Sequence, residues 1–217
     1  MAALGAAGLG ACAVLAACSP VQVGAAAVVG NQRITISSLD TQVSNLQASV
    51  THYGSTLQSI NSQLQQQQQQ LPVYAAPLSR VVLNWQITFA ISDQMAAANG
   101  ISVSPAQGQA ALSKAAKANG VSTNVYLTAI GIPVQQSQQG GRYVAEQTAL
   151  EAKFGSSNTT ALTKAACSAA KGLSINVSPQ FGRFDYSALS LVAGNDTLSR
   201  PAGTPSPANT EGLTPAC

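Results

Sequence analysis

The chain has 217 residues, of which 46% are hydrophobic and 8% charged, so it is long enough for one domain with a sizeable core. Its ten Lys and Arg residues are scattered singly and form no basic stripe, which argues against nucleic-acid binding. Its single histidine, His52, excludes metal sites and catalytic centres that use several histidines. We therefore expect neither an enzyme nor a bound cofactor or metal.

The amino-terminal residues 2–17 are uncharged, rich in Ala, Gly and Leu, and about as long as the apolar part of a secretory signal. They end at Leu15-Ala16-Ala17-Cys18, which resembles the bacterial lipobox, although no Lys or Arg precedes the apolar stretch. In a lipobox the Cys receives a diacylglyceryl group and becomes the first mature residue. This pattern predicts a signal peptide over 1–17, lipidation of Cys18 and a tether over 18–25. The alternative is an ordinary Ala-rich signal, or a buried helix, that happens to hold a Cys.

The remaining cysteines divide by position. Cys12 leaves with the signal peptide and Cys18 carries lipid, which leaves Cys167 and Cys217 as an even pair in an exported protein. A disulfide between them is plausible. Because Cys217 is the last residue behind a Pro-rich stretch, a free or crosslinking thiol is the alternative.

After the tether, apolar residues alternate on both sides of Gly30-Asn31, which predicts a β-hairpin over 26–36. Ser37 and Asp40 form an S-x-x-D capping box at the start of a helix. Apolar residues then follow in steps of three and four, which predicts one long helix with a narrow seam. This heptad seam packs either against the next helix or against a second chain. It consists of Leu39, Val43, Leu46, Val50, Tyr53, Leu57, Ile60 and Leu64.

The segment from Leu78 to Asn99 contains no Gly or Pro and is apolar on two opposite sides of a helix. Two apolar stripes predict a central helix that is packed on both sides, or packed on one side with the other open to a ligand. One stripe contains Leu78, Val81, Val82, Trp85, Phe89 and Ala96. The opposite stripe contains Leu83, Ile87, Ile91, Met95 and Ala98.

Shorter helices are predicted over 105–118, 122–130, 134–154 and 158–171, and the third of these is expected to be interrupted at Gly140-Gly141. Glu146 and Glu151 fall on a polar helix face and are expected in water, as is His52. Extended structure returns over 174–185, and residues 193–217 form a Gly/Pro/Ser/Thr tail that is expected to be disordered.

Several segments carry a resemblance that runs over most of residues 15–202. They are Leu15-Ala16-Ala17-Cys18-Ser19-Pro20, Ala26-Val28-Val29-Gly30 with Arg33-Ile34-Thr35 leading to Leu39, Asn99-Gly100-Ile101-Ser102-Val103-Ser104, Cys167 with Ala169-Ala170-Lys171, and Asn176-Val177-Ser178-Pro179-Gln180-Phe181-Gly182. With the order of the elements, they resemble the SurA-type chaperone family in its actinobacterial lipoprotein branch. Members with isomerase activity carry a parvulin domain near the carboxyl end, for which this chain has neither the length nor the paired histidines.

The resemblance implies a mainly α fold with a small β element over residues 26–192, in which the amino-terminal hairpin pairs with the strand region Ile175 to Phe184. It also implies a monomeric, lipid-anchored holdase on the extracytoplasmic face of the cell membrane, whose partners are unfolded or nascent exported polypeptides. The client-binding candidates are Leu83, Ile87, Ile91, Met95, Trp85 and Phe89, which are alternatively explained as core residues. The alternative function is a structural or assembly lipoprotein that oligomerises through the heptad seam.

Overall fold

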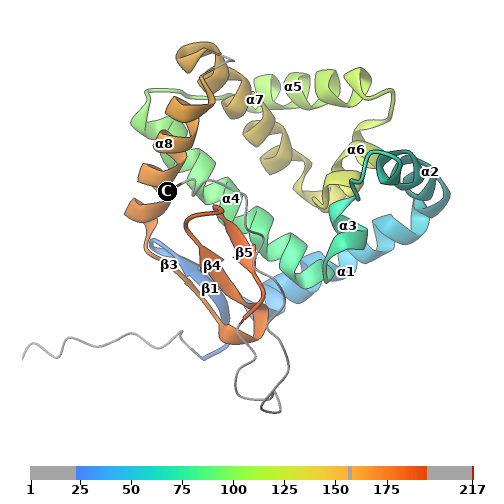
Figure 1. Cartoon of the computed structure of the whole chain (residues 1–217), viewed down its shortest axis with the longest axis horizontal. Helices are drawn as coiled ribbons and strands as arrows, with labels where there is room; N and C mark the ends of the chain where they lie inside the picture. Colours follow the sequence, from blue (N-terminus) through green and yellow to red (C-terminus); the bar gives the residue numbers. More distant parts are fainter. Residues whose placement is uncertain (1–22, 156–157, 195–216) are drawn as a thin grey trace, which may run out of the picture.

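The computed structural model describes residues 23–155, 158–194 and 217. It is mainly helical and contains small antiparallel sheets, which confirms the predicted fold class (Figure 1). Helix α4 (Leu78–Ala98) crosses the middle of the molecule, and the other helices and the sheets are arranged around it (Figure 1). The lipidation candidate Cys18 and most of the predicted tail lie outside the described residues.

The predicted hairpin consists of β1 (Ala25–Val29) and β2 (Gln32–Thr35), which pair antiparallel. Strand β3 (Ile175–Val177) pairs antiparallel with the other edge of β1, so that Asn176 lies opposite Val28. The sheet order is therefore β2-β1-β3. The expectation that a distant carboxyl-terminal strand completes the sheet of the hairpin is confirmed for this segment.

Beyond β3 the expected pairing is wrong. The chain leaves the first sheet through a 3-10 turn, η2 (Pro179–Phe181), and forms a second hairpin from β4 (Arg183–Asp185) and β5 (Ser190–Val192). Pro179 cannot donate a backbone hydrogen bond, which is one reason why the strand of the first sheet ends before it. The second hairpin packs against α4 and β3.

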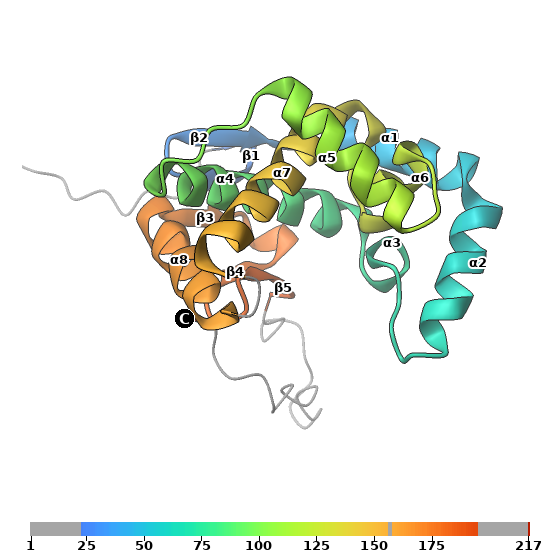
Figure 2. The ribbon, with the colours of Figure 1, turned by 90° about the horizontal axis from the view of Figure 1, so that it is seen from above.

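The predicted long helix is wrong in one respect, because it is divided at Tyr53 into α1 (Ile36–His52) and α2 (Gly54–Gln65). The chain turns sharply between these two helices (Figure 2). A straight helix would carry a heptad seam gradually away from its partner, and Gly54 lowers the cost of a bend. The bend keeps Leu57 fully buried. The cap of α1 also differs from the prediction, since Thr35 Oγ1 accepts the Ser38 N–H.

Short helix α3 (Pro72–Ala75) leads into α4, whose end at the cap Asn99 agrees with the prediction. Both predicted stripes of α4 contain buried residues, because α4 packs against α1 and β1 as well as against α7 and α8. Helices α5 (Pro105–Ala118) and α6 (Thr123–Ile130) begin within one residue of the predicted starts, and Ser104 and Ser122 cap them.

Helix α7 (Ser137–Phe154) follows the 3-10 turn η1 (Val134–Gln136) and packs along α5, while α8 (Thr159–Leu173) packs on α4. The expected interruption at Gly140-Gly141 is wrong, because α7 is continuous through both glycines. A Cβ on Gly141 would lie 2.7 Å from the Gly108 carbonyl oxygen of α5. Gly141 and Gly108 therefore allow the backbones of α7 and α5 to approach closely.

Candidate functional site

Leu83 and Ile87, both predicted as client-binding candidates, are fully buried and belong to the main hydrophobic core. They face the side of α4 that packs on other elements of this chain, so no client can touch them in this structure. For these residues the core interpretation replaces the client-binding one. Burying them stabilises the fold by about 2 kcal/mol each, which explains why an apolar stripe is needed there.

Phe89 is also buried, in a second core cluster with Leu112 and Leu127. Trp85 is half-buried between the two clusters. Its indole ring packs at a tilt against the Phe89 ring and edge to face against the Tyr143 ring. Its Nε1 donates to the Ile130 carbonyl at 2.7 Å. Trp85 is thus mainly an anchor between α4, α6 and α7, although one side of it borders a pocket described below.

Ile91 and Met95 are also buried members of the main core, 7% and 4% exposed. Unlike Leu83 and Ile87, they line a pocket of about 250 Å³ between α4, α7, α8 and the turn of the second hairpin. We call it the α8 pocket. Its apolar lining consists of Ile91, Met95, Leu162, Ala166 and Leu189. Its polar lining consists of Thr88, Ser92, Tyr143, Gln147 and Thr163. The lining contains no acidic or basic side chain. Its one phenol, Tyr143, stays neutral at pH 7 because burial raises its pKa above the usual value.

A polar cluster around the buried Glu146 borders the α8 pocket, to whose lining it contributes Ser92 and Gln147. Ser92 Oγ donates to Glu146 Oε2 at 2.7 Å and accepts from Gln147 Nε2 at 3.3 Å. Arg142 Nε donates to Glu146 Oε1 at 2.8 Å. Glu146 is only 2% exposed, so the expectation that it lies in water with Glu151 is wrong. A buried carboxylate is tolerated here because both of its oxygens accept hydrogen bonds.

Arg142 also pairs with Asp93, whose Oδ1 lies 3.0 Å from Arg142 Nη2. Two carboxylates therefore share one guanidinium group. Burial and the negative charge of Glu146 raise the pKa of Asp93 from 3.8 to about 6, although Arg142 acts in the opposite direction. The cluster ties α4 to α7 beside the pocket.

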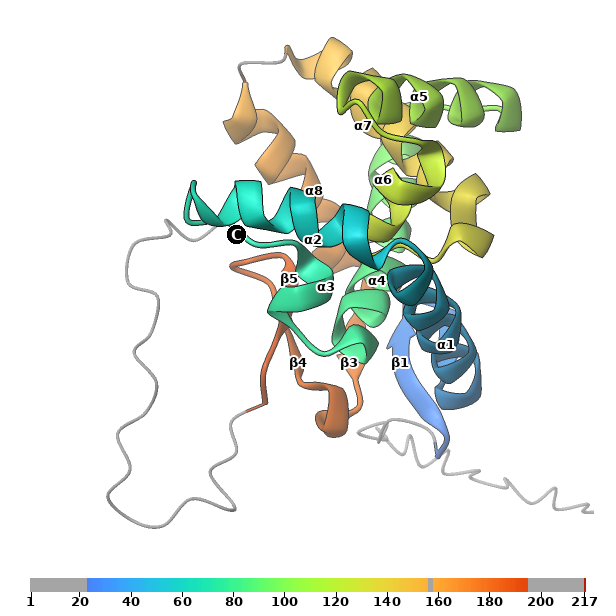
Figure 3. The same cartoon turned by 90° about the vertical axis from the view of Figure 1, so that its right-hand side faces the viewer.

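A second pocket, of about 390 Å³, lies between α3, the first half of α4, the end of α6 and β5, elements that stand next to one another in Figure 3. We call it the Arg80 pocket. The helix α4 contributes Arg80, Val81, Asn84 and Trp85. The remaining lining residues are Gln70, Pro72, Ala75, Ala76, Ile130, Ser190 and Leu191.

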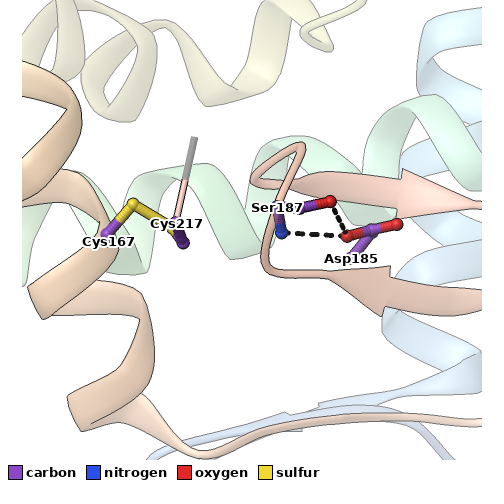
Figure 4. Close-up of a disulfide and its surroundings, with 4 residues drawn as sticks. All are labelled: Cys167, Asp185, Ser187 and Cys217. Carbon is purple, nitrogen blue, oxygen red and sulfur yellow. Dashed lines mark hydrogen bonds between the residues drawn. A yellow bond between two sulfur atoms is a disulfide. The ribbon is translucent and has the colours of Figure 1, made fainter. Parts of the chain in front are cut away.

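Cys167 in α8 is bonded to Cys217, with the two Cα atoms 5.4 Å apart. Of the two alternatives that the sequence left open, the structure therefore has the disulfide. Figure 4 shows it next to the turn between β4 and β5, where Asp185 accepts hydrogen bonds from the backbone and hydroxyl of Ser187. These two hydrogen bonds lower the pKa of Asp185. His52 is exposed, as expected, and its ring contacts Tyr53 edge to face.

Sequence reasoning missed Arg80, Asn84 and the Ser92–Glu146 pair. Neither pocket could be derived from periodicity alone, because each combines helices with a short strand or turn from the far end of the chain. One signal was present for Arg80. A cation in the first turn of a helix is repelled by the positive end of the helix dipole. An Arg at this position is therefore unfavourable for the helix, which is a signal that it has another role.

Comparison of the chain with protein-family models, with curated protein sequences and with solved structures finds no match. Within residues 23–155 and 158–194, no helix combines the length and apolar character needed to cross a membrane. The same part of the chain contains no group of three or more His, Cys, Asp or Glu side chains that could hold a metal ion.

Proposed function

We propose that this protein is a lipid-anchored chaperone on the extracytoplasmic face of a membrane, where it holds unfolded or nascent exported polypeptides without catalysis. The α8 pocket is the observation that carries the proposal. Its lining is uncharged and mostly apolar in surface, and Ile91 and Met95 of the central helix contribute to it.

The size of the α8 pocket suits a side chain better than a large ligand. Small-molecule sites usually occupy about 300 to 1,000 Å³, whereas a cavity of about 150 Å³ is enough for benzene. A pocket of about 250 Å³ therefore accommodates one aromatic or branched side chain with part of its backbone. Such a pocket would bind many sequences weakly, which is what holding unfolded chains requires.

The topology gives the proposal separate support. A hairpin completed by a strand from the far end of the chain, beside a helical body, is the arrangement that the resemblance to SurA-type chaperones implies. The alternative function, assembly through the heptad seam, loses its main argument. Leu39, Leu46 and Leu57 of the seam are fully buried in the core of this chain, which leaves no continuous apolar seam for a second copy.

An aggregation assay with a matched pair of variants tests the proposal. The purified protein should slow light scattering by a chemically denatured client, and it should not accelerate prolyl isomerisation of a peptide. Ala166→Leu places additional carbon atoms in the α8 pocket and should reduce the holding activity severalfold without lowering the melting temperature. Ser168→Leu adds the same side chain to an exposed position of α8 outside the pocket and should leave the activity unchanged.

The outcomes are distinct. A protein that does not slow aggregation at a tenfold molar excess over the client contradicts the proposed function. Equal activity of Ala166→Leu and the unmodified protein, with both well folded, contradicts the assignment of the α8 pocket as the contact site.

A further inference from the structure

We propose that the Arg80 pocket is a binding site for a carboxylate attached to an apolar body, the chemistry found at the carboxyl terminus of a polypeptide that ends in an apolar residue. The inference stands apart from the proposed function, because it uses a different pocket and different residues.

The first step is the state of the Arg80 guanidinium. Among the described residues, Arg80 has no ion-pair partner and no hydrogen-bond acceptor, and its Nε atom is buried without one. A buried donor without an acceptor is unfavourable, and it is more so when the donor is charged. Arg80 as a whole is only partly buried and lines the pocket, so an anion bound there would give this charged group the partner that it lacks within the chain.

The second step is the electrostatics of the surrounding wall. None of the side chains that line the pocket is acidic. Arg80 lies in the first turn of α4. That turn contains no acidic residue, and no side chain caps the helix there. The positive end of the helix dipole therefore adds to the charge of the guanidinium. An anion is the ligand that this uncompensated positive potential favours.

The third step concerns which anion fits. Asn84 uses its Oδ1 to accept the Leu191 N–H at 2.8 Å, which leaves its amide nitrogen as a second donor beside Arg80. Arg binds planar carboxylates through paired N–H donors. The rest of the wall is made of apolar carbon from residues such as Pro72, Val81 and Ile130, with the Trp85 ring held in place by its own hydrogen bond. This combination fits a carboxylate joined to an apolar group better than a free inorganic anion.

Trp85 makes the test direct, because it is the only Trp in the chain and it borders the pocket. We would titrate the protein with the peptide acetyl-Gly-Ser-Gly-Val-Leu bearing a free carboxyl terminus, and follow the tryptophan fluorescence. Two further probes would be the same peptide with an amidated terminus, and an amidated peptide in which Glu stands between Val and Leu.

We expect the free acid to change the Trp85 fluorescence saturably and to bind at least tenfold more tightly than the amide. Arg80→Gln should abolish this difference, whereas Arg33→Gln, at an exposed arginine of β2, should preserve it. If the internal Glu peptide binds as tightly as the acid, the site is for carboxylates but the chain-end assignment is overturned. Equal binding of acid and amide, or equal binding by Arg80→Gln and the unmodified protein, overturns the proposal.

The melting temperature of Arg80→Gln is the control for folding, and no loss is expected because the variant removes an unpaired charge. The aggregation assay separates this site from the proposed function. Normal holding by Arg80→Gln with lost acid binding leaves both conclusions in place, whereas absent holding with intact acid binding contradicts only the proposed function.

Discussion

Glu146 is the residue whose environment differs most from what its sequence position suggests. It lies in a helix face that reads as polar, yet it is 2% exposed and bonded to Ser92 and Arg142. The reason lies in the partner helix, because Ser92 supplies a hydroxyl donor from α4 at the point where α7 crosses. A buried polar pair of this kind depends on tertiary contacts, so no pattern within α7 alone could reveal it.

Glu146→Ala should lower the free energy of unfolding by about 2 to 3 kcal/mol, because it leaves the buried Ser92 hydroxyl without its acceptor and removes one of the two carboxylates that pair with Arg142. The control is Glu151→Ala, which removes an exposed carboxylate from the same helix and should change stability by less than about 0.5 kcal/mol. Urea denaturation measures both values. Similar values for the two variants would mean that Glu146 is solvated after all.

The neighbouring Asp93 should make stability depend on pH. Its pKa of about 6 in the folded chain exceeds the ordinary 3.8, so between these values the folded state keeps a proton that the unfolded state has released. Its stabilising contribution is therefore complete below about pH 4 and is lost as the pH rises through about 6. Asp93→Asn mimics the protonated acid and lacks this dependence.

The measurement is the difference in unfolding free energy between the unmodified protein and Asp93→Asn at several pH values from 4 to 7. We expect the unmodified protein to lose stability relative to the variant as the pH rises. A difference for Asp93→Asn that is flat, or that increases in favour of the unmodified protein, would show that Arg142 dominates.

At the scale of elements, the packing of α5 against α7 depends on Gly108 and on Gly141, one of the two glycines that were expected to interrupt the helix. Gly141→Ala would place a Cβ 2.7 Å from the Gly108 oxygen, so the helices must separate. We expect a loss of about 1 to 2 kcal/mol, because overpacking outweighs the better helix propensity of Ala. Gly172→Ala in α8, where nothing lies within 4 Å, should instead stabilise by up to about 1 kcal/mol. Thermal or urea unfolding of the pair checks this; equal effects would contradict the close crossing.

Elements with strong local signals could be predicted from the sequence. The ends of α4 follow from Pro77 and Asn99-Gly100, and the caps Ser104 and Ser122 mark α5 and α6 correctly. Features that depend on another element could not. The bend at Tyr53 is one example, and the second hairpin is another, since its turn over 186–189 contains neither Gly nor Asn and has Leu189 at φ 50°.

The candidate sites were predictable only in part, for a similar reason. Periodicity identified α4 as the helix with two apolar sides, and this gave Ile91 and Met95 as well as Leu83 and Ile87. It could not distinguish the buried residues that line a pocket from those that are fully enclosed, because that depends on how α8 and the turn of the second hairpin pack on α4.

At the scale of the whole molecule, the proposal requires an anchor that precedes the described residues. We expect Cys18 to carry a diacylglyceryl group and to be the first mature residue, since two acyl chains give stable membrane attachment where one does not. Mass spectrometry of the membrane fraction tests this, with Cys18→Ser as the control that should lack the lipid. A recovered peptide that spans Ala17 and Ser19 with an unmodified thiol would contradict it.

The central claim, that unfolded polypeptides enter the α8 pocket, has a natural reporter. The chain contains two methionines, Met1 and Met95, and Met95 lines the pocket. In protein labelled with ¹³C at the methionine methyl groups, the signal lost in Met95→Leu belongs to this pocket. Addition of reduced and carboxymethylated lactalbumin, which stays unfolded, should shift or broaden that signal, and native lactalbumin should not. An unchanged Met95 signal, at client concentrations where the protein prevents aggregation, would contradict the account.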